Sequence, residues 1–340
     1  MSSGRAKLKD VAGKAGVSLS TASKALNNSQ DVAEETRLRI RKIAKDLHFA
    51  PNALIRSLQR GTSNTIGICT WAVSVVPATH SIAYNLLKGI ADEVTESRQD
   101  LLLYSDFLGK RDEDLVHVFM DGRVDGVIVG PHVLNQYGLE ELVRAGIPAV
   151  VLYNENAPAK MSKVTIDNRS GILAVMRHLY DLGHTRIAFT APQNTFDYQA
   201  RYSAYLYSMS VLGIQTPPAF HIGEESTPAT INRVLDEWAQ TEMPTAIVAG
   251  DDSIAMKWID ALTKRGLNVP EDISITGFDD APGAASSPGL TTIRQDAEAV
   301  GRHAVMFVNA ILLSTDPQPQ HIMLPVELVV RNSAKRLNQK

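Results

Sequence analysis

The chain has a single cysteine, Cys69, among its 340 residues. One cysteine cannot form an internal disulfide, and the lack of any CxxC motif or Cys/His cluster argues against a zinc site. Cys69 falls in the apolar run IGICTWAV, which is typical of a small buried side chain. No apolar run approaches the ~20 residues that cross a bilayer. The first ten residues, MSSGRAKLKD, lack the apolar stretch of a signal peptide. We therefore expect a cytoplasmic protein.

The common sequence signatures of enzymes are also missing. The sequence contains no GxxxxGK[ST], no GxGxxG after a strand, no HExxH and no GxSxG. The nine histidines are scattered, and His178 and His184, which flank the end of one helix, are expected to be structural. Paired aspartates can bind a metal, but an isolated DD is weak support for one. We therefore expect no enzyme activity, no catalytic residues, no metal and no cofactor.

Acidic residues only slightly outnumber basic ones, giving a formal net charge of −3, but the charge is unevenly distributed along the chain. Residues 1–61 contain 12 Lys and Arg against 5 Asp and Glu, whereas the remainder contains 22 against 32. A basic head on an acidic body indicates that one domain faces a polyanion and the other does not. The alternative for the head is an ordinary solvated basic surface.

The basic head predicts three short helices. They are LKDVAGKAG, LSTASKALN with Ser18 as its N-cap, and EETRLRIRKIAKDL. The third has an apolar stripe of near-helical spacing, formed by Leu38, Ile40, Ile43, Ala44 and Leu47.

The first two helices have the features of a helix-turn-helix. Ala12 provides the small residue where two helices touch, and Gly16 tolerates positive φ in the turn. Five further residues are predicted to face inward: Val11, Ala15, Val17, Ala22 and Ala25. Five residues of the second helix are predicted to face outward: Leu19, Ser20, Thr21, Ser23 and Lys24. Short polar side chains and one cation suit base edges and phosphates. An ordinary helical hairpin is the alternative.

A linker and then a different pattern follow. After Pro51-Asn52 comes ALIRSLQR, a short helical candidate with a basic face, and residues 61–64 are typical of a linker. From residue 65, apolar runs alternate with helical segments. The predicted strands are TIGICTWAV, DLLLYS, VDGVIVG, PAVVLY, RIAFTA, TAIVAG and ISITGF. The predicted helices are IAYNLLKGIADEVTE, LEELVRAG, GILAVMRHLYDLG, INRVLDEWAQ and IAMKWIDALTKRG. This alternation predicts doubly wound parallel sheets, and the number of strands favours two lobes.

Polar residues follow several of these strands. Asp251-Asp252 follow TAIVAG, Asp279-Asp280 follow ISITGF, and Tyr153-Asn154 follow PAVVL. Ligands of doubly wound sheets bind beyond the carboxyl ends of the strands, so these groups favour a polar-ligand cleft. Structural alternatives exist for three residues: Asp252 as the N-cap of the next helix, Asp280 as a turn residue, and Arg201 as a surface charge.

The head segment LKDVAGKAGVSLSTASKALN, with FAPNALIRSL after it, closely resembles the DNA-binding head of the lac repressor family. The resemblance implies that Leu19, Ser20 and Lys24 read bases. It assigns backbone-contacting or helix-supporting positions to Thr21, Ser23 and Asn27. It makes the segment with Asn52, Ile55 and Leu58 a hinge helix, in which Leu58 wedges into the minor groove of a palindrome. Lys24 stands where the family usually has arginine, and Ile55 where it more often has alanine.

The resemblance continues through the body. It rests on DGVIVG, VTIDN, HLYDLGHTRIAF, PTAIVAGDDSIAM, GLNVPEDISITGFDD and LTTIRQD, which match the family in its order. It implies a two-lobed body similar to periplasmic sugar-binding proteins. The effector site would then be lined by Arg201, Asp251 and Asp279, and by Tyr153 or Asn154. Asp251 departs from the asparagine and Tyr153 from the aspartate common in the family.

Together, these observations predict an α/β protein with a three-helix head and a two-lobed body. We expect a helix-turn-helix domain at 1–47, a hinge at 48–63 and an effector-binding and dimerisation domain at 64–340. Lobe 1 is expected at about 64–166 and 294–320, and lobe 2 at about 167–293 and 321–340.

The expected function is that of a transcriptional repressor controlled by a small effector, most simply a carbohydrate. A palindromic double-stranded DNA operator requires a two-fold protein, hence a homodimer. The alternative is a sugar-binding or sugar-processing protein whose basic head does not bind DNA.

Overall fold

The computed structural model describes residues 6–27, 29–50, 61–70, 82–105, 110–131, 133–215, 217–281, 283–286 and 289–337. The chain separates into two compact units, Met1–Asn64 and Thr65–Lys340, which we call the head and the body. The two units are described separately below.

The described part of the head contains α1 (Leu8–Ala15), α2 (Leu19–Leu26) and α3 (Glu34–Asp46). Its small core consists of Val11, Ala15, Ala25, Val32, Ile40 and Ala44. Alanines make up half of this core, so the helices approach closely. The three predicted helices are confirmed. Of the stripe predicted on α3, Leu38 is 56% exposed and does not join the core.

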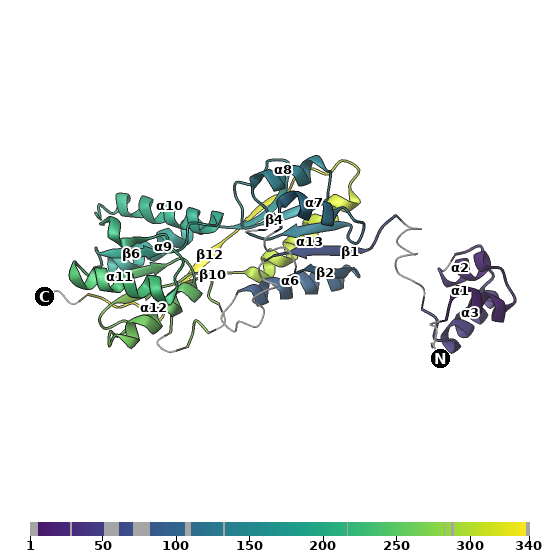
Figure 1. The fold of residues 1–340 in the computed structure, drawn as a ribbon, viewed down its shortest axis with the longest axis horizontal. Helices are drawn as coiled ribbons and strands as arrows, with labels where there is room; N and C mark the ends of the chain where they lie inside the picture. Colours follow the sequence, from purple (N-terminus) through teal and green to yellow (C-terminus); the bar gives the residue numbers. More distant parts are fainter. Residues whose placement is uncertain are drawn as a thin grey trace. The chain divides into compact units, whose positions relative to one another are not determined.

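The first lobe of the body is built on a fully parallel sheet in the order β11-β5-β4-β3-β1-β2. Its strands are β1 (Thr65–Cys69), β2 (Asp100–Tyr104), β3 (Gly126–Val129), β4 (Ala149–Leu152), β5 (Ser162–Ile166) and β11 (His321–Leu324). Its helices are α6 (Ala83–Glu96), α7 (Asp112–Phe119), α8 (Gln136–Arg144) and α13 (Ala297–Leu313). Strand residues alternate between two apolar clusters: Ile128 packs on the α6–α13 side, and Val127 and Val129 on the α7–α8 side. The sheet is therefore covered by helices on both faces (Figure 1).

The second lobe contains a parallel sheet in the order β7-β6-β8-β9. Its strands are β6 (Ile187–Thr190), β7 (His221–Ile222), β8 (Ala246–Ala249) and β9 (Ser274–Thr276). Its helices are α9 (Asn168–Asp181), α10 (Phe196–Val211), α11 (Pro228–Gln240) and α12 (Asp252–Lys264), with a 3-10 turn, η1 (Pro218–Phe220). The rings of Trp238 and Trp258 stack inside it, with centroids 5.3 Å apart. All seven predicted strands of the body are present, and the predicted doubly wound fold is confirmed.

The chain passes between the lobes at three places. Asp167 joins β5 to α9, and β10 (Thr292–Gln295) and β12 (Val326–Val329) form an antiparallel ribbon at the junction (Figure 1). Residues 321–324 form β11, which pairs with β5 in the first sheet, so the chain is still part of that sheet at Leu324.

Candidate functional site

The turn between α1 and α2 is held by two local features. Gly16 has a φ of 66°, in the left-handed region that favours glycine, and its N–H donates to the carbonyl of Gly13 at 3.2 Å. Ser18 caps α2, because its hydroxyl oxygen accepts a hydrogen bond from the N–H of Thr21 at 3.0 Å. Both roles agree with the sequence prediction, and together they set the direction of α2.

The outer face of α2 carries the residues predicted to contact DNA. Leu19, Ser20, Lys24 and Asn27 are exposed, while Thr21 and Ser23 are half-buried. Ala22 and Ala25 are completely buried on the opposite face, against the rest of the head. An apolar side chain as exposed as Leu19, at 54%, is available to contact a partner. Asn52, Ile55 and Leu58 of the predicted hinge lie outside the described residues.

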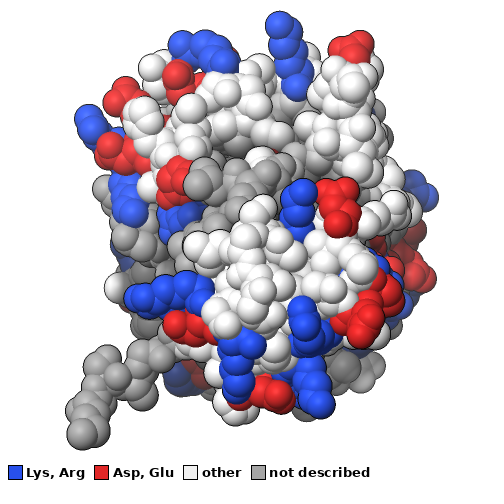
Figure 2. Space-filling view, turned by 90° about the vertical axis from the view of Figure 1, so that its right-hand side faces the viewer, with Lys and Arg blue, Asp and Glu red and all other residues white. Residues whose placement is uncertain are grey.

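The charged residues of the head form a local ion pair at α2, and α3 carries several exposed cations. Lys24 reaches the carboxylate of Asp31 at 2.9 Å, and this contact lowers the pKa of Asp31 below its usual range. The exposed cations of α3 are Arg39, Arg41, Lys42 and Lys45. Figure 2 shows basic and acidic side chains interspersed on one face of the molecule, with uncharged surface between them.

In the body, the candidate site centres on Arg201, on the first half of α10. This residue is only 3% exposed, which rules out the surface-charge alternative. Its Nε donates to the amide oxygen of Asn168 at 2.8 Å, and one terminal nitrogen donates to the carbonyl of Gly250 at 2.6 Å. The other terminal nitrogen lies 3.7 Å from a carboxylate oxygen of Asp279. The guanidinium also lies over the ring of Phe278, 3.7 Å from its centroid.

Asp279 connects this cluster to the inter-lobe ribbon. The side-chain amide of Gln295, at the end of β10, donates to its carboxylate at 2.6 Å. Burial raises the pKa of Asp279 well above its usual value, although the neighbouring Arg201 partly opposes this. The φ of Asp279 is 117°, a conformation that side chains other than glycine rarely adopt. Such backbone strain is typical of functional positions.

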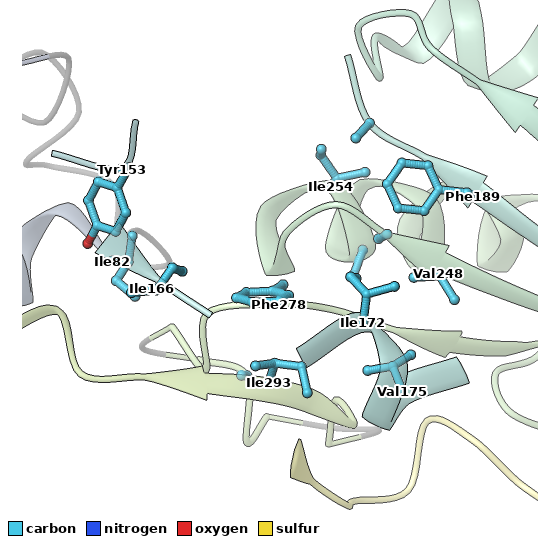
Figure 3. Packing of buried hydrophobic residues seen from close by; sticks show 14 of the residues in the cluster. Ile82, Tyr153, Ile166, Ile172, Val175, Phe189, Val248, Ile254, Phe278 and Ile293 are labelled. Atoms are coloured by element: carbon cyan, nitrogen blue, oxygen red, sulfur yellow. The ribbon is translucent and has the colours of Figure 1, made fainter. Parts of the chain in front are cut away.

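Tyr153 contributes to the cluster from the end of β4 in the first lobe. It is 8% exposed, has a φ of 57°, and its hydroxyl has no hydrogen-bond partner among the described residues. Burial, reinforced by the charges of Asp279 and Asp197, raises the pKa of its phenol well above the usual value. Figure 3 shows its ring beside Ile82 and Ile166. The neighbouring Asn154 is buried, and its side-chain oxygen accepts from the N–H of Asn156 at 2.9 Å.

The N-cap expected at Asp252 lies one residue earlier. Asp251, not Asp252, is the N-cap of α12: its carboxylate accepts from the N–H of Ile254 at 2.7 Å, and its other oxygen accepts from the hydroxyl of Tyr198 at 2.5 Å. Asp252 is buried within the lobe. The prediction failed because two adjacent carboxylates at a helix start are indistinguishable in sequence. Asp251 still contacts the cluster through Tyr198.

Asp280 has the structural role foreseen as an alternative. Its two carboxylate oxygens accept from Arg294 at 2.8 Å and from Arg331 at 2.6 Å. These two arginines lie on β10 and just after β12. Asp280 therefore holds the inter-lobe ribbon against the second lobe.

Four members of the cluster were not predicted: Asn168, Asp197, Tyr198 and Gln295. Asp197 accepts from the amide of Asn168 at 2.7 Å, and burial raises its pKa to about 6. Asp197 and Tyr198 precede Arg201 by four and three residues, which places all three on one face of a helix. That spacing is the signal that identifies them, once the segment is assigned as a helix.

Two other kinds of feature, a metal centre and a membrane-spanning helix, are absent from the described ranges. No three His, Cys, Asp or Glu side chains there are grouped so that they could hold a metal ion. Among the same residues, no helix is both long and apolar enough to span a bilayer.

Comparison with protein families matches residues 7–52 to the bacterial regulatory proteins of the lacI family, and residues 176–334 to a periplasmic binding protein-like domain. The chain is 30% identical to the HTH-type transcriptional regulator DegA of Bacillus subtilis, covering 97% of this chain and 98% of the relative. It is 29% identical to the HTH-type transcriptional repressor CytR of Escherichia coli, covering 98% and 97% respectively.

Solved structures share the fold over nearly the whole chain. A lac repressor dimer bound to operator and the anti-inducer ONPF matches with a TM-score of 0.82 at 22% identity, over 98% of this chain and all of that one. The complex of the transcriptional regulator CelR with cellobiose matches with a TM-score of 0.72 at 25% identity, over 97% and 100%. The chain belongs to the lacI family of bacterial regulatory proteins, and is a DNA-binding transcriptional regulator with an effector-binding body.

Proposed function

We propose that this regulator is a repressor that binds a palindromic operator as a homodimer. A small polyhydroxylated effector changes its affinity for the operator. The observation that carries the proposal is the buried pair of Arg201 and Asp279 in the second lobe, whose charges act on the buried phenol of Tyr153 at the end of β4 in the first lobe. A regulator of operator DNA acts in the cytoplasm, and nothing in this proposal requires turnover of the effector.

On the DNA side, α2 supplies the direct contacts. Leu19, Ser20 and Lys24 face the base edges in the major groove, and Thr21, Ser23 and Asn27 contact the backbone or support the helix. Lys24 must leave Asp31 to reach DNA, and the exposed pair costs little to break. Asn52, Ile55 and Leu58 form the minor-groove contact at the centre of the operator.

On the effector side, Arg201, Asp251, Asp279, Tyr153 and Asn154 offer donors and acceptors together. Sugar hydroxyls donate and accept at once, so carboxylates and amides suit them. Cellobiose in the CelR complex is consistent with this class of ligand. Because Tyr153 belongs to one lobe and Asp279 to the other, a ligand that contacts both has different affinities for different lobe arrangements, and it shifts their equilibrium.

Two substitutions test the proposal, each with a control. Lys24→Ala should weaken retardation of operator DNA roughly tenfold or more, whereas Lys264→Ala, on the exposed surface of α12, should not. Asp279→Asn keeps the shape of the side chain and should abolish the rise in melting temperature produced by the effector. Asp260→Asn, at an exposed site, should retain that rise. Equal retardation by Lys24→Ala and wild type would refute the DNA assignment. A preserved thermal response in Asp279→Asn would refute the effector site.

A further inference from the structure

The effector cluster contains more negative than positive charge. Asp279 lies 3.7 Å from the Arg201 guanidinium, and Asp197 is linked to the same guanidinium only through the side chain of Asn168. Two carboxylates therefore share one cation in a site with little solvent. Burial raises the pKa of both carboxyl groups and Arg201 only partly opposes the rise, so their charged forms are disfavoured unless a further cation lies beside them.

Neither the remaining donor capacity of Arg201 nor the nearby Asp251 changes this excess of carboxylates over cations. The three nitrogens of Arg201 already face Asn168, Gly250 and Asp279, so little of the guanidinium remains to attract an anion. Asp251 is a third carboxylate, but its oxygens accept from the first turn of α12 and from Tyr198. The helix N-terminus stabilises that charge. Asp197 and Asp279 are therefore the carboxyl groups of the site that lack a full counter-charge.

Two unpartnered polar atoms point to a ligand with many hydrogen-bond donors. The side-chain amide of Gln295 donates a hydrogen bond to Asp279, while its carbonyl oxygen is buried with no partner in the part of the chain that the structure describes. The hydroxyl of Tyr153 is also unpartnered, and both residues are 8% exposed. A carboxylate and an amide oxygen only accept, and a phenol both donates and accepts. The site as a whole is thus rich in acceptors.

We propose that the effector carries a protonated amine beside its hydroxyl groups, as an amino sugar does, and that Asp197 and Asp279 bind the ammonium. This inference rests on the effector site proposed above. An ammonium supplies three donors and one positive charge, which matches the acceptor-rich, anionic cluster. A neutral sugar supplies donors but brings no positive charge to stabilise the ionised carboxylates, whose charged form burial disfavours.

Matched ligand pairs test the inference on the full-length protein. Thermal shift and calorimetric titration compare glucosamine with glucose, galactosamine with galactose, and mannosamine with mannose. We expect at least one amine to bind about tenfold or more tightly than its neutral twin. Its N-acetyl derivative, which keeps the nitrogen but loses the charge, should lose that advantage.

Each other outcome has a distinct meaning. Binding of a neutral sugar as tightly as its amine overturns the inference but leaves the proposed function intact. Failure of every amine to bind overturns it as well, and operator retardation by the same sample then shows whether the regulator assignment still holds.

A charge-removing variant provides an independent readout. Asp197→Asn should reduce the preference for the amine over its neutral twin by about tenfold, and circular dichroism verifies that the variant is folded. Asp181→Asn, at an exposed position paired with Arg177 on α9, should retain the preference. An undiminished preference in Asp197→Asn would rule out that carboxylate as the amine's partner.

Discussion

Asp252 is a carboxylate that the fold holds away from solvent, at 2% exposure. One oxygen accepts from the hydroxyl of Thr292 at 2.5 Å and the other from the N–H of Ala281 at 2.8 Å. It thereby ties the start of α12 to β10, the strand that runs toward the first lobe. Burial raises its pKa to about 7, and the two hydrogen bonds only partly oppose this rise.

The raised pKa gives the stability of the body a defined pH dependence. Between about pH 4 and pH 7, folded Asp252 binds a proton that the unfolded chain has already lost, so its contribution to stability increases as the pH falls. Asp252→Asn can still accept from Ala281 and donate to Thr292, so it should fold. Its free energy of unfolding should vary less steeply over this range, by at most about 1.4 kcal/mol per pH unit. Urea unfolding at several pH values measures the slope, and a variant slope equal to that of wild type would contradict the assignment.

At the residue scale, the sequence predicts the roles of side chains that act on their own segment of the chain. Gly16 and Ser18 act on their own turn, so their residue types predict their roles. The roles of Asp251 and Asp252 cannot be told apart in this way. Asp252 is distinguished by its hydrogen bond to Thr292, which is 40 residues away in the sequence. Asp197 and Gln295 likewise join the cluster through contacts between distant segments. No local pattern specifies such contacts.

At the scale of elements, glycine permits the closest helix contact in the first lobe. A Cβ on Gly89 of α6 would fall on the backbone of Glu298, and one on Gly301 of α13 would lie 2.5 Å from the carbonyl of Leu86. These glycines let the two helices touch backbone to backbone. Gly13 of α1 is the contrasting case, since a Cβ there would meet no atom within 4 Å.

The two kinds of helical glycine should respond oppositely to alanine. Gly89→Ala should destabilise the body by about 1–3 kcal/mol, because the helices must separate. Gly13→Ala should stabilise the head by about 0.5–1 kcal/mol, because alanine favours the helix and clashes with nothing. Thermal unfolding of each unit checks the two signs. A stabilised Gly89→Ala would show that the contact between α6 and α13 is looser than described.

Ser18 allows a second test at this scale. Ser18→Ala removes the acceptor of the Thr21 N–H and should cost the head about 1 kcal/mol. Ser18→Asp can still cap α2 and should restore most of that stability. Unfolding of the head followed by circular dichroism distinguishes the two variants, and equal stability of wild type and Ser18→Ala would exclude a capping role.

The sequence predicts elements best where burial is continuous. Of the seven strands found by their apolar runs, β1, β3, β4, β6 and β8 lie inside the sheets, while β2 and β9 lie at sheet edges. β5, β10, β11 and β12 were missed because polar or charged residues interrupt them, as in SKVTI and TIRQ. α13 was missed because AEAVGRHAVMFVNAILL is apolar around most of its circumference. Its periodicity is weak, since it packs on both α6 and the sheet.

At the scale of the whole molecule, the division after Asn64 predicts separable functions. A fragment of residues 65–340 contains both complete sheets. It should fold, and its melting temperature should rise with the effector, but it should not retard operator DNA. For the full chain, retardation should weaken steeply with salt, because Lys and Arg release counterions from phosphates. Specific retardation by the fragment would show that the head is not the DNA-binding unit.

The late position of β11 has a consequence for how the protein is made. Residues 8–46 contain all three described helices of the head, so the head can fold as soon as it leaves the ribosome. The first lobe, by contrast, lacks α13 and β11 until Leu324 has been synthesised. Until then β5 presents an open strand edge, and an apolar face of the sheet lacks one of its helices. Translation therefore passes through a long stage in which the sheet of the first lobe has an unpaired edge, and synthesis of β11 ends that stage.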